Sequence, residues 1–127
     1  MKRVRAAVVG VGRHGRLHAR IYAQNPGVEL VAVCDADLAR AKAVADEYKA
    51  AAVPRIEDLP KDLDAVSVVV PTSAHFPVAR FFLERGISAL VEKPMTRTSE
   101  EAAALAEISR RTGAHLVPGF VERFNPV

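Results

Sequence analysis

The sequence predicts an α/β protein with one doubly wound parallel sheet whose two faces are both covered by helices. Three observations support this fold class: short apolar runs alternate with amphipathic segments, a glycine-rich turn follows the first run, and capping or turn residues separate the segments. Right-handed crossovers between parallel strands place the helices against the sheet. With 127 residues, 50% of them hydrophobic, the chain is long enough for a single domain with a substantial core.

The first part of the chain predicts a strand–helix–strand unit. Residues Val4–Val9 form an apolar run that ends at Gly10, which is typical of a buried parallel strand. A helix is expected over Arg13–Gln24, because apolar residues repeat at helical spacing and Asn25-Pro26-Gly27 follows as a stop. The next apolar run, Val28–Cys34, predicts the second strand.

The middle of the chain continues this alternation. A short strand is expected at Ala51–Val53, and the run Ala65–Val70 predicts the most clearly buried strand. Pro77 is expected in the first turn of a helix that Gly86 ends, and Ile87–Val91 predicts a further strand. Between the second and third strands, the inner face of a helix is marked by Leu38, Ala41, Ala45 and Tyr48.

The last elements have clear boundary residues. Thr98 and Glu101 form a capping-box pattern before an alanine-rich helix, which ends in two arginines and Gly113. Ala114–Val117 predicts the last strand. The regular order stops at Pro118-Gly119, so we expect a domain over residues 1–119 and, over 120–127, the start of a connection to a further domain.

The turn after the first strand predicts a dinucleotide site. It reads Gly10-Val11-Gly12-Arg13-His14-Gly15 and matches the G-x-G-x-x-G pattern of Rossmann folds. Gly10 permits the turn, Gly12 lets a pyrophosphate approach the backbone, and Gly15 lets the helix pack close to the strand. Backbone N–H groups at the helix start, including that of His14, then face the phosphates. In a plain strand–turn–helix, by contrast, Asp35 would only cap the next helix.

Asp35 bears on the choice of cofactor. It lies twenty residues after Gly15, at the end of the second strand, where a carboxylate can accept hydrogen bonds from the adenosine ribose. Because a carboxylate repels a 2′-phosphate, NAD is favoured over NADP. Arg40 lies about one helical turn further on and could reach a phosphate, but we expect it to be a solvated helix residue.

Composition argues against several other function classes. The 18 Lys and Arg residues are spread along the chain against 15 Asp and Glu, so no nucleic-acid footprint stands out. No apolar run approaches the roughly 20 residues of a membrane-spanning helix. Cys34 is the only cysteine and reads as a small buried apolar residue, and the four histidines show no metal-site spacing. We therefore expect a soluble, cytoplasmic protein without a metal.

Taken together, these motifs resemble a known oxidoreductase family. It is the family of glucose–fructose oxidoreductase, inositol dehydrogenase and a rhizopine-catabolism protein (Gfo/Idh/MocA). The resemblance extends over essentially the whole chain, through segments in the family's order: residues 10–19, 71–75, 92–94, 98–102 and 119–126. The most specific of these is Glu92-Lys93-Pro94.

The resemblance implies hydride transfer between a nicotinamide cofactor and a sugar, polyol or nucleotide-sugar alcohol. It also implies that Glu92 and Lys93 lie near the nicotinamide, with a cis peptide bond before Pro94. Oxidation of an alcohol requires loss of its hydroxyl proton as hydride leaves the carbon, and Lys93 is the expected proton relay. His75 either contacts the cofactor or caps a helix, whereas His18 is expected to pack. The other residues implied along the cofactor are Arg13, Val70, Pro71 and Thr72.

The chain departs from the family in one respect. Family members carry a second α/β domain, which supplies most of the substrate pocket and the dimerisation sheet, so the oligomeric state stays open. Arg123 and Asn125 are candidates for substrate contact in an intact enzyme. The alternative function is a stand-alone dinucleotide-binding module, a sensor or partner subunit without turnover. The presence of Lys93 favours the enzyme, although the 127-residue chain alone is expected to be inactive.

Overall fold

Six parallel strands form one sheet within residues 2–119, the part of the chain that the computed structural model describes. The strands are β1 (Val4–Val9), β2 (Val28–Cys34), β3 (Ala51–Val53), β4 (Ala65–Val68), β5 (Ser88–Glu92) and β6 (Leu116–Gly119). The helices are α1 (Arg13–Gln24), α2 (Leu38–Tyr48), α3 (Thr72–Leu83) and α4 (Ser99–Thr112), with a short 3-10 turn η1 (Ile56–Asp58). The strand order is β3-β2-β1-β4-β5-β6, with every neighbouring pair parallel.

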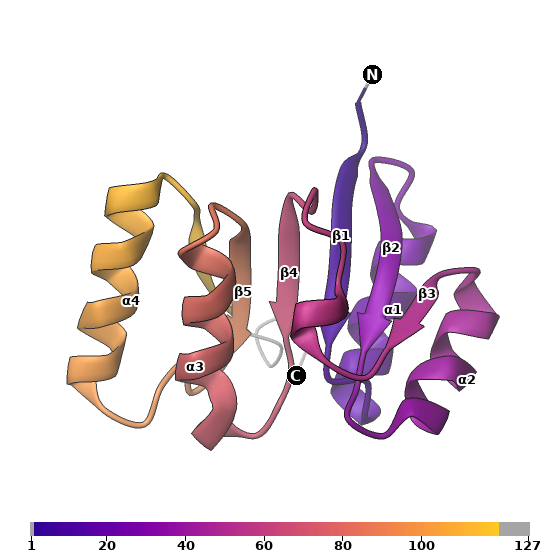
Figure 1. Ribbon diagram of the computed structural model, residues 1–127, viewed down its shortest axis with the longest axis horizontal. Coiled ribbons are helices and arrows are strands. Elements are labelled where there is room, and N and C mark those ends of the chain that lie inside the picture. Colours follow the sequence, from indigo (N-terminus) through magenta and orange to yellow (C-terminus); the bar gives the residue numbers. More distant parts are fainter. Residues whose placement is uncertain (1, 120–127) are drawn as a thin grey trace, which may run out of the picture.

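The helices cover both faces of the sheet, which confirms the doubly wound fold. Figure 1 shows α1 and α2 toward the β3 end of the sheet and α3 and α4 toward the other end. Successive residues of β1 face opposite sides: Val8 joins an apolar cluster with residues of α1 and α2, whereas Ala7 and Val9 join a cluster with α3 and α4. A parallel sheet buried on both faces needs such continuous apolar strands.

The predicted boundaries agree with the structure most closely in the first part of the chain. Both strands and the helix of the first unit have the predicted bounds, and so does β3. Helix α2 contains all four residues that were expected on its inner face. The later strands are displaced: β4 ends two residues earlier than expected, and β5 and β6 begin one and two residues later. Each displaced end was predicted next to a breaker residue, Pro71, Gly86 or Gly113, but the paired strand stops or begins one or two residues away from the predicted end.

The prediction that Pro77 lies in the first turn of its helix is wrong. Helix α3 already begins at Thr72, and Pro77 is inside it. Proline removes one helical hydrogen bond, here the one to the carbonyl of Ser73. Because Ser73 lies in the first turn, the loss falls near the helix start rather than in its middle. Gly86, with φ of 76°, provides the left-handed residue beyond the helix end.

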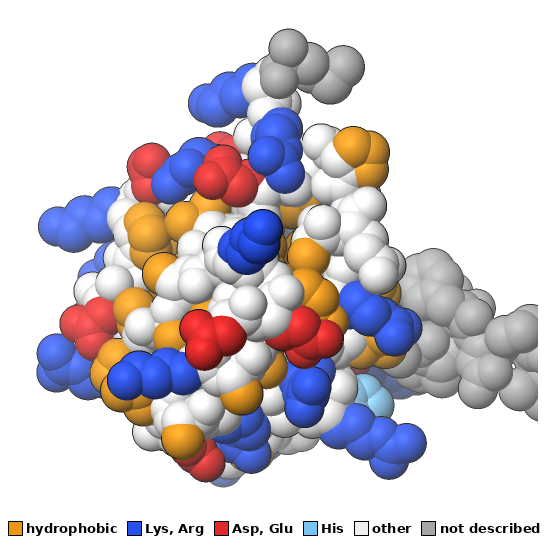
Figure 2. Space-filling model, turned by 90° about the vertical axis from the view of Figure 1, so that its right-hand side faces the viewer, with side chains coloured by type: hydrophobic (Ala, Val, Ile, Leu, Met, Phe, Trp, Pro, Cys, Tyr) orange, Lys and Arg blue, Asp and Glu red, His pale blue; other side chains and the backbone are white. Residues whose placement is uncertain are grey.

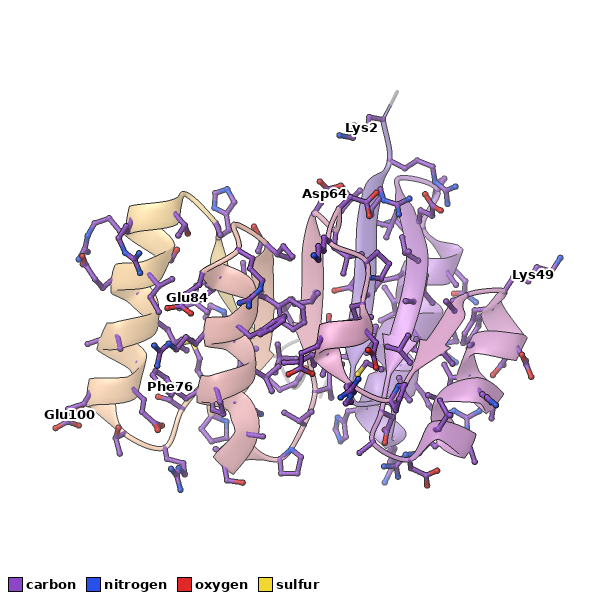
Figure 3. The ribbon with its side chains drawn as sticks, in the orientation of Figure 1. Lys2, Lys49, Asp64, Phe76, Glu84 and Glu100 are labelled. Atoms are coloured by element: carbon purple, nitrogen blue, oxygen red, sulfur yellow. The ribbon has the colours of Figure 1, made fainter. Side chains whose placement is uncertain are left out.

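The ends of two helices show how local sequence sets the boundaries. At the start of α4, Thr98 Oγ1 accepts a hydrogen bond from Glu101 N–H at 3.1 Å, as the capping-box pattern predicts. The Glu101 carboxylate in turn accepts from Arg97 N–H at 3.2 Å, one residue earlier than expected. At the end of α2, Lys49 takes a left-handed conformation with φ of 59°, and its side chain extends away from the body of the protein (Figure 3).

The surface and the helix lengths agree with the composition. On the face shown in Figure 2, Lys and Arg side chains are interspersed with Asp and Glu rather than gathered in one patch. Among the helices of the described residues, none is long and apolar enough to cross a membrane.

The strand order determines where a ligand can bind. All strands point the same way, so their carboxyl ends lie along one edge, the lower edge in Figure 1. The crossover after β1 packs on one face and the crossover after β4 on the other, so the strand order reverses between these two neighbours. Open α/β sheets bind ligands in the crevice at such a switch point.

Candidate functional site

A groove lies across the carboxyl ends of β1 and β4, where the strand order reverses. It consists of two adjoining cavities of about 450 Å³ and 330 Å³, which share Gly12, Val69, Val70 and Pro71 in their walls. The larger cavity reaches Asp35 at the end of β2. The smaller reaches Glu92 at the end of β5 and Lys93 after it. We call the two cavities together the edge groove.

The three glycines of the turn after β1 have different surroundings. Gly10 has φ of 91°, and a Cβ there would lie 2.3 Å from the Val69 carbonyl oxygen. A Cβ on Gly15 would lie 1.7 Å from the Gly10 carbonyl oxygen, so α1 packs against the turn as only glycine permits. A Cβ on Gly12 would meet nothing within 4 Å. Gly12 therefore leaves space in the edge groove itself, where a ligand can approach the backbone.

The start of α1 is suited to hold an anion. Gly12 is the N-cap residue, no side chain caps this end, and the first turn contains no acidic residue. The first N–H groups of a helix have no partners within the helix, and the helix dipole adds positive potential there. Arg13 and His14 are exposed and line the smaller cavity beside Gly12. This end of α1 therefore fits a pyrophosphate bound by the backbone.

Asp35 is buried and accepts four hydrogen bonds. Its donors are the N–H groups of Val11 at 3.0 Å and Asp37 at 2.9 Å, and the Nε and a terminal nitrogen of Arg40 at 3.1 Å each. Burial opposes ionisation of the carboxyl, but these hydrogen bonds outweigh it, so the pKa of Asp35 lies below its usual value. The carboxylate is therefore ionised at neutral pH.

Arg40 is an exposed residue of α2, as expected, but the sequence did not predict its partner. Its side chain is about half exposed and forms a two-point ion pair with Asp35. A carboxylate has about four acceptor positions, and in Asp35 all four are used. A ribose hydroxyl can therefore bind Asp35 only if Arg40 moves away from one of these acceptor positions or shares it with the hydroxyl.

The other end of the edge groove contains the residues that the family resemblance connects with the nicotinamide. Glu92 and Lys93 line the smaller cavity, opposite Gly12 and Gly15 of the turn. The Lys93–Pro94 peptide bond is cis, as predicted. The smaller cavity therefore lies at the ends of three strands, β1, β4 and β5. Its remaining lining residues follow β4: Val69, Val70, Pro71, Thr72 and His75.

His75 links the two loops that border this cavity. The residue is 2% exposed, with Nε2 of its ring at 2.8 Å from the Val70 carbonyl and Nδ1 at 2.9 Å from the Pro94 carbonyl. The residue lies inside the first turns of α3 and does not cap that helix. His75 thus holds the loop after β4 against the loop after β5, and both loops border the edge groove.

Sequence reasoning missed a polar network behind Glu92. His18 was expected to pack, but its Nε2 lies 2.8 Å from Glu92 Oε1 and its Nδ1 lies 2.9 Å from Ser67 Oγ. The Tyr22 hydroxyl lies 2.5 Å from the same Ser67 oxygen. One signal was available: Ser67 is the only polar residue in its apolar run, and His18 and Tyr22 are four residues apart on one helix face.

Two further expectations concern residues beyond this network. Arg123 and Asn125, the candidates for substrate contact, lie outside the described residues. Within residues 2–119, no group of three or more His, Cys, Asp and Glu side chains could hold a metal ion.

Comparisons with known proteins agree with this geometry. A family model described as "Oxidoreductase family, NAD-binding Rossmann fold" matches residues 4–120. UDP-N-acetylglucosamine 3-dehydrogenase of Acidithiobacillus ferrooxidans is 40% identical over 126 residues, which are 99% of this chain and 40% of that protein. The scyllo-inositol 2-dehydrogenase (NAD(+)) of Bacillus subtilis is 38% identical over 97% of this chain and 37% of its own length.

Solved structures show the same relationship. The crystal structure of the Acidithiobacillus ferrooxidans enzyme superimposes with a TM-score of 0.91 over 99% of this chain and 41% of that one. GenD2 from gentamicin A biosynthesis, solved in complex with NAD, is 29% identical, with a TM-score of 0.90 over 94% of this chain and 35% of that one. The chain thus spans about 40% of the length of the curated relatives that it matches.

Proposed function

This chain belongs to the oxidoreductase family with an NAD-binding Rossmann fold, and on that premise we propose that it is the cofactor half of a dehydrogenase. The enzyme would transfer hydride between NAD and an alcohol carbon of a sugar, polyol or nucleotide sugar. The observation that carries this proposal is the edge groove, which joins the glycine turn and Asp35 at one end to Glu92 and Lys93 at the other.

The two cavities of the edge groove match the two halves of a dinucleotide. The cavity that contains Asp35 takes the adenosine half, whose ribose hydroxyls donate to the carboxylate in place of the Arg40 nitrogens. The N–H groups at the start of α1 bind the pyrophosphate, and Gly12 leaves room for it. The cavity that contains Glu92 and Lys93 takes the nicotinamide half. A 2′-phosphate would lie beside the ionised Asp35, so NAD is preferred to NADP.

Lys93 is the proposed catalytic residue. NAD, when bound, accepts the hydride from the alcohol carbon, and the hydroxyl proton must leave the substrate as this happens. An amine beside the nicotinamide can take or relay that proton, and Lys93 lies in the wall of this cavity. A protein that only binds the dinucleotide would have no need of such a group.

We further propose two parts within this chain. Residues 1–119 form the dinucleotide-binding domain, and residues 120–127 lead into a second domain that supplies the rest of the substrate pocket. This division is supported by the relatives, of which the chain matches about 40%. We propose that Arg123 and Asn125 contact the substrate. We propose a cytoplasmic location, which agrees with a lone, unpaired Cys34.

Calorimetric titration of the chain with NAD and with NADP tests the proposal. NAD is expected to bind more tightly than NADP, and Asp35→Ala is expected to weaken NAD binding by about 1–3 kcal/mol, the range for hydrogen bonds to a charged group. Asp46→Ala is the matched control, since Asp46 is an exposed carboxylate on α2 away from the edge groove. Tighter binding of NADP would assign the ribose site to Arg40, and absence of binding would refute the proposal.

A further inference from the structure

A chain of hydrogen bonds runs between α1 and the face of the sheet that α1 covers, and it ends at the edge groove. It connects Tyr22 to Ser67, Ser67 to His18, and His18 to Glu92, with donor–acceptor distances of 2.5, 2.9 and 2.8 Å. The side chains of His18 and Glu92 are only 11% and 16% exposed. Burial of polar groups is unfavourable unless their hydrogen bonds are made, so a connected chain in this layer has a defined geometry.

The direction of these hydrogen bonds follows from the carboxylate at the end of the chain. An ionised Glu92 can only accept, so His18 Nε2 carries the proton and donates it. In the neutral ring Nδ1 is then an acceptor, and the Ser67 hydroxyl donates to it. The Ser67 oxygen in turn accepts from the Tyr22 hydroxyl. All three bonds therefore point toward Glu92, and they select one tautomer of His18.

Among the four linked side chains, only Glu92 lines the edge groove. Glu92 lines the smaller cavity of the edge groove next to Lys93, whereas His18 is not part of its wall. The Glu92 oxygen that faces His18 is also close to β6, because a Cβ on Gly119 would lie 3.1 Å from it. His18 thus holds the carboxylate beside Lys93, and Gly119, which has no Cβ, leaves room for it.

We propose that His18 is a positioning residue that fixes the Glu92 carboxylate at the nicotinamide end of the groove and so sets the balance between oxidised and reduced cofactor. The inference rests on the proposed function. The oxidised nicotinamide ring carries a positive charge and the reduced ring is neutral. A carboxylate held near the ring favours the oxidised form, and a carboxylate free to turn away favours it less.

The test compares the Kd values of NAD and NADH for the full 127-residue chain and its variants. Glu92→Gln removes the charge and should shift the ratio of the two Kd values toward NADH by roughly three- to tenfold. His18→Leu should shift the ratio in the same direction. His18→Gln should restore most of it, because the glutamine amide can still donate to Glu92. His115→Leu, a change at an exposed histidine outside the groove wall, should leave the ratio unchanged.

The double variant separates positioning from a packing defect. If His18 acts through Glu92, His18→Leu should have no further effect on the ratio when Glu92→Gln is already present. Ring nitrogen chemical shifts of the unliganded chain should report the Nε2–H tautomer of His18. An unchanged ratio in His18→Leu, additive effects in the double variant, or the Nδ1–H tautomer would overturn this inference alone. If wild-type chain bound neither cofactor, the proposed function would fail as well.

Discussion

Replacement of Asp35 by asparagine would test how the adenosine end of the groove is built. The amide has the shape of the carboxylate, but one of its two acceptor oxygens becomes a donor. Each Asp35 oxygen accepts from one backbone N–H and one Arg40 nitrogen, with Val11 on Oδ2 and Asp37 on Oδ1. Whichever way the amide turns, one backbone N–H therefore faces another donor: either the buried N–H of Val11 or the partly buried N–H of Asp37.

The expected loss of stability follows from that unpaired N–H. A buried donor without its acceptor costs about 1–3 kcal/mol. We take about 2 kcal/mol, which for a domain of this length lowers Tm by about 7 °C. Loss of the ion pair adds little, because the Arg40 side chain is 51% exposed. The control variant Arg40→Gln keeps both backbone hydrogen bonds to Asp35 and should lower Tm less than Asp35→Asn does.

The pH dependence has a definite sign. Because the folded-state pKa of Asp35 lies below its usual value, its contribution to stability is present above the unfolded value of about 3.9. It is lost as the pH falls through the folded pKa. Thermal unfolding followed by circular dichroism should thus show a smaller acid-induced fall in Tm for Asp35→Asn than for wild type. Equal Tm values at neutral pH, with equal acid dependence, would refute this account of the site.

Three further predictions concern the turn, the cysteine and turnover. Gly12→Ala should keep the wild-type Tm but weaken NAD binding at least about tenfold. Gly15→Ala should instead lose about 1–3 kcal/mol of stability, because its Cβ would lie 1.7 Å from the Gly10 carbonyl oxygen. Calorimetry measures the first effect and thermal unfolding the second, and equal effects of the two variants would contradict the roles derived for these glycines. Burial, together with nearby carboxylates, raises the pKa of the Cys34 thiol to about 11, so iodoacetamide should alkylate the native chain at neutral pH far more slowly than the urea-unfolded chain, as intact mass would show. The 127-residue chain should form no NADH from polyols, aldoses or nucleotide sugars at saturating NAD. Hydride transfer needs the substrate carbon held about 3–3.5 Å from the atom that accepts the hydride. Robust turnover that Lys93→Ala abolishes would contradict this prediction.

Local sequence was sufficient to predict most of the fold. The predicted boundaries at Gly10 and Asn25 coincide with those of the structure, whereas those next to Pro71, Gly86 and Gly113 are displaced by one or two residues. The glycine turn and Asp35 also located one end of the groove correctly on the edge of the sheet. The start of α3 was missed because Pro77 marks a helix start in general, whereas here the helix tolerates it one turn later.

The parts that could not be predicted depend on contacts between distant segments. His18 and Glu92 are 74 residues apart, and they meet only because β4 and β5 lie beside β1 in a particular register. Pairing of Asp35 with Arg40 depends on how α2 leaves its N-cap, which residue spacing alone leaves undetermined. Side-chain periodicity gives the face on which a residue lies, but not the partner that it finds there.

The sheet divides the apolar interior of the described chain into two clusters that have no buried side chain in common. A cavity made by Val44→Ala on the α2 side can be refilled only by neighbours on that side, and Phe82→Leu on the α3 side affects a separate set of contacts. The losses in unfolding free energy should be additive for two substitutions on opposite faces of the sheet and non-additive for two substitutions within one cluster. Side chains in one cluster can therefore be substituted without compensating changes in the other. Substitutions that move the backbone of the central strands would affect both clusters, because both pack against that backbone.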